Sequence, residues 1–81
     1  MSCIDKRGRL LSLGKVILKS LKKSGPMSAE ELSKASGVTE MSTIESGLKE
    51  LTDIGYIAES EGKYKISEKG EKMLSKFLSP F

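Results

Sequence analysis

The 81-residue chain contains no histidine and no tryptophan, and Cys3 is its single cysteine. The lack of histidine excludes the usual zinc ligand sets, histidine-based catalytic triads and the commonest general base. One cysteine cannot form an internal disulfide. We interpret Cys3 as a free thiol, with an intermolecular disulfide or a redox sensor as the alternative. No glycine loop of the phosphate-cradling kind is present either, so we expect no enzyme, no metal and no cofactor.

Long apolar runs are also absent. No stretch approaches the roughly 18 to 20 apolar residues that cross a bilayer. The start of the chain, residues 1–9, lacks the apolar core and small-residue cleavage site of a signal peptide. We therefore expect a soluble cytoplasmic protein with no membrane partner. The length suits one domain, with residues 1–9 as a basic flexible arm and residues 10–81 as the folded part.

The first folded segment has a helical pattern. From Leu10 the apolar positions recur at spacings of three and four, at Leu10, Leu11, Gly14, Ile17, Leu18 and Leu21. Gly25-Pro26 ends this helix, because proline cannot continue it. Leu13 and Val16 widen the apolar stripe beyond the needs of one small core, which indicates a second contact surface.

Two more helices are predicted next. Ser28 and Glu31 have the spacing of a capping box, so the second helix begins at about Ser28 and runs to about Ser36. Gly37 supplies a turn with positive φ, and Thr39 is the expected N-cap of the third helix. That helix extends to Ile54 before Gly55, and its apolar face comprises Met41, Ile44, Leu48, Leu51 and Ile54.

A hairpin and a last helix complete the pattern. Residues 56–60 and 64–66 read as two strands around a turn at residues 61–63, with Lys63 and Lys65 facing away from Tyr64 and Ile66. Ser67 is the expected cap of the final helix. The sequence thus predicts a mainly α fold with a small β-hairpin.

Several segments together resemble the winged helix-turn-helix superfamily, in particular its minimal prokaryotic (archaeal or bacterial) transcription-regulator type. The resemblance covers about residues 12–78, and its motifs are residues 27–32, 36–39, 47–57 and 64–74. It implies a three-helix core, a two-stranded wing and a C-terminal helix. It also implies a transcription regulator that binds double-stranded DNA, as a homodimer.

By this resemblance, the helix from about Thr39 to Ile54 enters the major groove. The face opposite its apolar side would carry the contacts: Thr39, Ser42, Ser46 and Lys49, with Thr43 nearer the edge. Hydroxyl groups suit base edges or phosphates but discriminate weakly between bases. The amides at the start of this helix also suit an anion. The alternative is an ordinary solvated face.

Basic residues elsewhere supply further candidates for DNA binding. Lys63 and Lys65 at the wing suit phosphates, or they protect a solvated hairpin from edge pairing. Lys6, Arg7 and Arg9 in the arm suit the minor groove or phosphates, with a solubilising tail as the alternative.

The charge distribution favours a competing interpretation. Residues 1–24 hold seven basic and one acidic side chain (+6), residues 25–55 two and six (−4), and residues 56–81 five and four (+1). The segment expected to read DNA is therefore the most acidic one, although DNA affinity depends largely on phosphate neutralisation. The alternative function is a protein–protein interaction module, or a subunit of a larger assembly, that uses this acidic surface.

A homodimer would need an apolar seam between the first and last helices. The candidates are Leu13, Val16, Phe77, Leu78 and Phe81, and the alternative is that they close a single core. Few aromatic residues are available to line a small-molecule effector pocket, and their spacing specifies no ligand.

Overall fold

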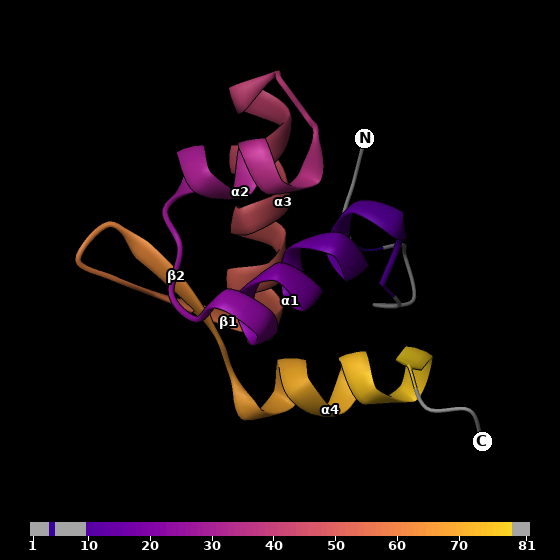
Figure 1. The fold of residues 1–81 in the computed structure, drawn as a ribbon. Helices are drawn as coiled ribbons and strands as arrows, with labels where there is room; N and C mark the ends of the chain where they lie inside the picture. Colours follow the sequence, from indigo (N-terminus) through magenta and orange to yellow (C-terminus); the bar gives the residue numbers. More distant parts are fainter. Residues whose placement is uncertain (1–3, 5–9, 79–81) are drawn as a thin grey trace.

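The structure is a computed structural model that describes Ile4 and residues 10–78 (Figure 1). Its elements are α1 (Ser12–Ser24), α2 (Ala29–Ser36), α3 (Met41–Ile54), β1 (Ile57–Ser60), β2 (Lys63–Ile66) and α4 (Glu68–Leu78). The predicted mainly helical fold with an antiparallel hairpin is confirmed. Within the described part of the chain, no helix is long and apolar enough to span a bilayer.

The predicted boundaries of α2 are confirmed by its caps. The Ser28 N–H donates to Glu31 Oε1 at 2.9 Å, and the Glu31 N–H donates to Ser28 Oγ at 3.2 Å. This reciprocal pairing is the capping box. At the other end Gly37 has φ 77°, in the left-handed region that glycine adopts without a steric penalty.

Two predicted helix starts are wrong. The first helix begins at Ser12 with Leu11 at its N-cap, whereas Leu10 lies before it and is buried. Thr39 does not cap α3; Glu40 holds the N-cap position in an extended conformation, without a side-chain cap hydrogen bond. The chain therefore runs one residue further past Gly37 before the helix begins.

The hairpin also differs from its predicted bounds. Lys63 belongs to β2, because the turn is the two-residue Glu61-Gly62 with φ 52° and 79°, and Ser60 pairs with Lys63. Positive φ at both central residues matches the twist of a tight hairpin. Tyr56 precedes β1, and its N–H donates to the Leu51 carbonyl as the chain leaves α3.

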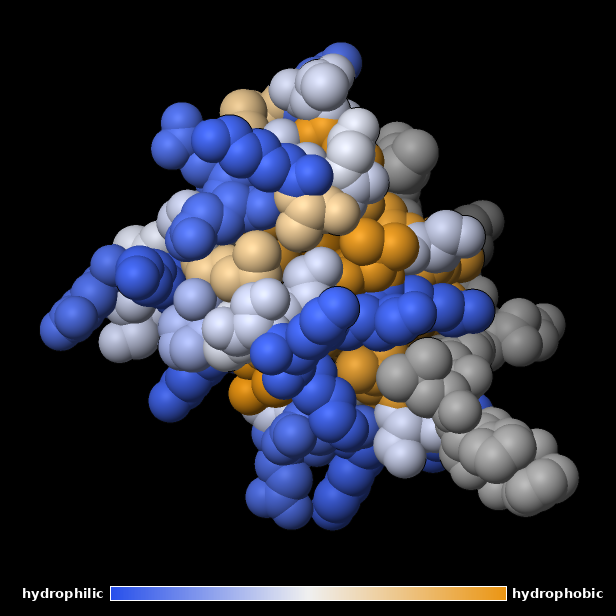
Figure 2. Space-filling model, in the orientation of Figure 1, coloured by the Kyte–Doolittle hydropathy of each residue, from blue (hydrophilic) through white to orange (hydrophobic). Residues whose placement is uncertain are grey.

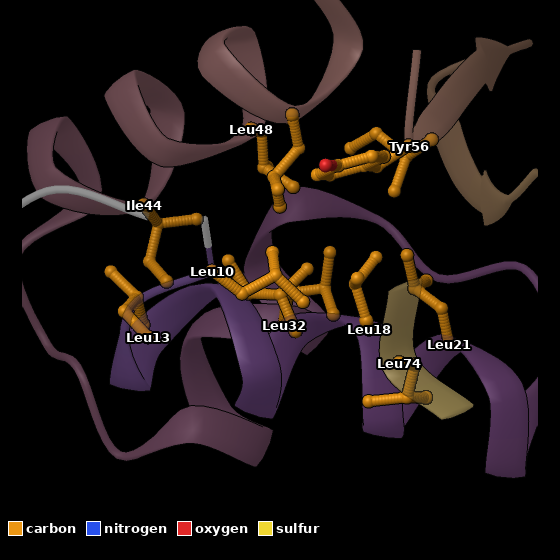
Figure 3. Close-up of a cluster of buried hydrophobic side chains, with 12 residues drawn as sticks. Leu10, Leu13, Leu18, Leu21, Leu32, Ile44, Leu48, Tyr56 and Leu74 are labelled. Atoms are coloured by element: carbon orange, nitrogen blue, oxygen red, sulfur yellow. The ribbon is translucent and has the colours of Figure 1, made fainter. Parts of the chain in front are cut away.

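The core lies where the helices converge, and its side chains point toward one another in Figure 3. Each helix contributes residues that are at most 1% exposed: Ile17, Leu18 and Leu21 from α1, Leu32 from α2, Ile44, Leu48 and Leu51 from α3, and Leu74 from α4. The predicted apolar face of α3 is thus confirmed at its three central positions. Burying such side chains is the main favourable contribution to folding.

The hairpin is attached to the segment that precedes α2. Met27 and Tyr64 form an antiparallel bridge, with N–H to carbonyl distances of 2.9 and 2.7 Å in the two directions. β2 therefore pairs with β1 on one side and with Met27 on the other. Figure 1 shows the hairpin reaching away from the helices, and the bridge holds β2 beside the residue that precedes the N-cap of α2.

Candidate nucleic-acid interface

The side of α3 opposite the core carries the predicted contact residues. Ser42, Ser46 and Lys49 are exposed, and their spacings of four and three residues place them in one stripe along the helix. Thr39 is exposed in the turn before the helix, and Thr43 is half-buried at the edge of the stripe. The structure therefore brings the five predicted residues onto one side of α3 and its preceding turn.

Glu40 joins this group, and the sequence interpretation left it out. Its Oε1 accepts hydrogen bonds from Ser42 Oγ at 3.0 Å and from Thr43 Oγ1 at 3.4 Å. A carboxylate near a helix N-terminus is also favoured by the helix dipole. The anion site expected at the start of α3 is therefore next to a negative charge of the chain itself. The signal available in the sequence was a glutamate two residues before Ser42 and three before Thr43.

The turn between α2 and α3 is held by serine side chains. Ser33 Oγ donates to the Val38 carbonyl, Ser36 Oγ donates to the Ser33 carbonyl at 3.2 Å, and Ser36 Oγ accepts from the Val38 N–H at 3.4 Å. Val38 also packs against the core. These contacts fix the direction in which α3 leaves α2.

The hairpin presents its lysines away from the core. Along β2 the side chains alternate, with Lys63 and Lys65 exposed and Tyr64 and Ile66 half-buried, as predicted. Lys63 and Lys65 line a surface hollow together with Pro26, Ser60 and Glu61. The structure thus places both predicted wing residues on one side of the hairpin.

Acidic residues lie between and around these groups. The pKa of Tyr64 is raised by burial of its ring first, and then by the carboxylates of Glu59 and Glu45. Glu45 of α3 is therefore close enough to the hairpin to act on Tyr64. Glu50 and Asp53 lie further along α3, so an acidic helix lies beside the two exposed lysines of β2.

The remaining predicted residues fall into two groups. Lys6, Arg7, Arg9 and Phe81 lie outside the described residues, as do the side chains of Phe77 and Leu78. Ile4, the described residue of the proposed arm, bridges to Leu10 and packs against the core.

Of the dimer-seam candidates, Leu13 and Val16 have different environments. Leu13 is 5% exposed and belongs to the core, which fits the single-core alternative for that residue. Val16 is 37% exposed and lines a groove between α1 and α4 with Leu74 and the lysines Lys19, Lys22 and Lys23. On the face drawn in Figure 2, the apolar surface lies in narrow strips between hydrophilic side chains.

Comparisons with protein-family models, with curated proteins and with solved structures give no match to this chain.

Proposed function

We propose that this chain is a DNA-binding transcription regulator of the winged helix-turn-helix type, which places α3 in the major groove and the hairpin lysines against phosphates. The observation that carries the proposal is the two-sided character of α3. Ile44, Leu48 and Leu51 on its aliphatic side are buried, and its opposite side presents hydroxyl groups and Lys49 to solvent. A rigid helix with an exposed polar stripe is the element that such proteins insert into a groove.

The hairpin supports the same function. Tyr64 of β2 is bonded to Met27, just before the N-cap of α2, so α2, α3 and the hairpin form one connected unit. Lys63 and Lys65 project from this unit, and lysine is suited to phosphate contacts that position a protein without specifying sequence. Two copies related by twofold symmetry would present two α3 helices to adjacent major grooves, with exposed Val16 as part of the seam.

The test is a binding assay with duplexes selected from a random pool. The double variant Ser42→Glu/Ser46→Glu adds two negative charges to the stripe, and each costs about 1 kcal/mol near a phosphate in water. We expect affinity to fall about tenfold or more, since 1.4 kcal/mol is tenfold. The matched control, Ser12→Glu/Ser75→Glu, adds the same charge at exposed serines of α1 and α4. Equal losses in both variants would contradict the proposal.

A second candidate function follows from the acidity of residues 25–55. Two lysines against six carboxylates suit a basic protein surface better than DNA. A salt titration with random duplex separates the two candidates. The regulator binds duplex with an affinity that falls steeply with salt, by about 0.9 log units per log unit of salt for each phosphate neutralised. An interaction module binds duplex only weakly and without selectivity.

A further inference from the structure

We propose that Glu40 determines sequence specificity, by accepting a hydrogen bond from the exocyclic amino group of a cytosine or an adenine in the major groove. The inference deepens the proposed function and rests on it. Two hydroxyl groups donate hydrogen bonds to Glu40. These bonds determine which donors and acceptors the start of the α3 stripe presents to a base edge.

Each of these hydroxyls has a single proton, and each donates it to the same carboxylate oxygen. Ser42 Oγ is 3.0 Å and Thr43 Oγ1 3.4 Å from Glu40 Oε1. The hydroxyls are therefore left with lone pairs only, and Oε2 adds further acceptor capacity. Free serine and threonine side chains donate or accept, whereas this arrangement only accepts.

An acceptor-only surface selects among base edges. In the major groove the hydrogen-bond donors are the N4 amino group of cytosine and the N6 amino group of adenine, whereas guanine presents two acceptors. The N7 and O6 atoms of guanine would face the carboxylate lone pairs and repel them. The start of the stripe therefore favours C or A on the contacted strand and rejects G at that position.

The carboxylate of Glu40 also weakens binding to DNA of any sequence. Glu40 is exposed, so its charge repels the phosphates of any duplex, whatever the sequence. Removing it should strengthen binding to random DNA while it weakens discrimination between bases. A residue with a purely structural role would not shift these two quantities in opposite directions.

The experiment uses the full chain and a duplex selected by it from a random pool. At each cytosine of the selected site the amino group is deleted by substituting 2-pyrimidinone, and at each adenine by substituting purine. The position that responds also shows whether the contacted base is cytosine or adenine. For the wild type we expect one such position to lose about fivefold in affinity. For Glu40→Ala the same deletion should change affinity less than twofold, and binding to random duplex should rise about twofold.

Asp53→Ala is the matched control. It removes one carboxylate from the other end of the same helix, about 20 Å away at 1.5 Å per residue, and it should retain the fivefold loss. If Glu40→Ala lowers the thermal stability, the experiment uses Glu40→Gln instead, which keeps the side-chain length. This variant should shift the preferred base toward adenine, the usual partner of an amide.

The outcomes are distinguishable. Equal sensitivity of wild type and Glu40→Ala to every amino deletion overturns the role of Glu40 and leaves the proposed function intact. Failure of the wild type to select any duplex overturns the proposed function itself, and this inference with it.

Discussion

The α-carbon of Gly70 lies against the backbone carbonyl of Tyr56, so that a Cβ added at residue 70 would be 2.1 Å from the Tyr56 oxygen and 2.9 Å from Ile66 Cγ1. Tyr56 follows α3 and Gly70 lies in the first turn of α4. The same carbonyl accepts a hydrogen bond from the Ser67 N–H at 2.9 Å, so a shift of this carbonyl would also strain that bond. The start of α4 is thus seated directly on the end of α3.

Replacing Gly70 with alanine tests this seating. Helix propensity alone would make Gly70→Ala stabilising by about 1 kcal/mol. A contact of 2.1 Å with backbone requires a shift, and overpacking typically costs about 1 to 3 kcal/mol. We expect net destabilisation in urea-induced unfolding. Ser75→Ala at an exposed position of α4 is the control and should change stability by less than about 0.5 kcal/mol. A stabilised Gly70→Ala protein would show that the helix is not seated as described.

Lys69 closes the same junction from the α4 side. Its Nζ donates to the Ile54 carbonyl at 2.8 Å, at the C-terminus of α3, and lies 5.5 Å from the centroid of the Tyr56 ring. The last turn of α3 has no basic residue of its own, so Lys69 supplies the positive charge there. We expect Lys69→Met to lower the free energy of unfolding by about 0.5 to 1 kcal/mol at low salt, and by less in 1 M salt.

The control for Lys69 is Lys72→Met in the next turn. Lys72 pairs with Glu68 at 3.5 Å, but both side chains are highly exposed, so this ion pair contributes about 0.3 to 0.5 kcal/mol. If the two methionine variants lose the same stability with the same salt dependence, the contact with Ile54 has no special role.

The capping box of α2 makes the free energy of unfolding depend on pH. The hydrogen bond from the Ser28 backbone, followed by that from its side chain, lowers the pKa of Glu31 below its ordinary value of 4.5. Because the folded pKa is depressed, the ionised carboxylate stabilises the fold above pH 4.5, and this contribution is lost as the pH falls through the folded pKa. We expect Glu31→Gln to be less stable than wild type at pH 7, and we expect this difference to shrink as the pH falls below 4.5.

Urea unfolding of both proteins across this pH range measures the effect. Glu30→Gln is the matched control, since Glu30 is also exposed in the first turn of α2 but is not the glutamate of the capping box. The difference between Glu30→Gln and wild type should change less with pH than that of Glu31→Gln. A constant difference for Glu31→Gln would contradict the ionised capping box.

The hairpin lysines should affect salt dependence rather than sequence preference. Replacing Lys63 and Lys65 with alanine should weaken binding to all duplexes alike, and should reduce the slope of log K against log salt by about 1 for each lysine. The control Lys72→Ala/Lys76→Ala removes the same charge from exposed positions of α4. An unchanged slope in the hairpin variant would show that the hairpin lysines do not contact the duplex.

The sequence predicted those elements that depend on local chemistry. The capping box at Ser28, the left-handed Gly37, the end of α3 before Gly55, and the alternation along β2 each involve residues close together in the chain. These features follow from backbone sterics and side-chain periodicity, which neighbouring residues determine.

Contacts between distant segments were not predictable in this way. The Met27–Tyr64 bridge and the approach of Gly70 to Tyr56 join residues that only the packing of the core brings together. The N-cap position of Glu40 was not predicted, because threonine has a stronger capping preference than glutamate.

The proposed function requires that the polar stripe of α3 contacts DNA. The most direct test is the change in backbone amide shifts of the ¹⁵N-labelled chain when a selected duplex is added. We predict that the largest changes lie within residues 39–49, with a second group at residues 63–65. Changes confined to α1 and α4, with residues 39–49 unaffected, would contradict it.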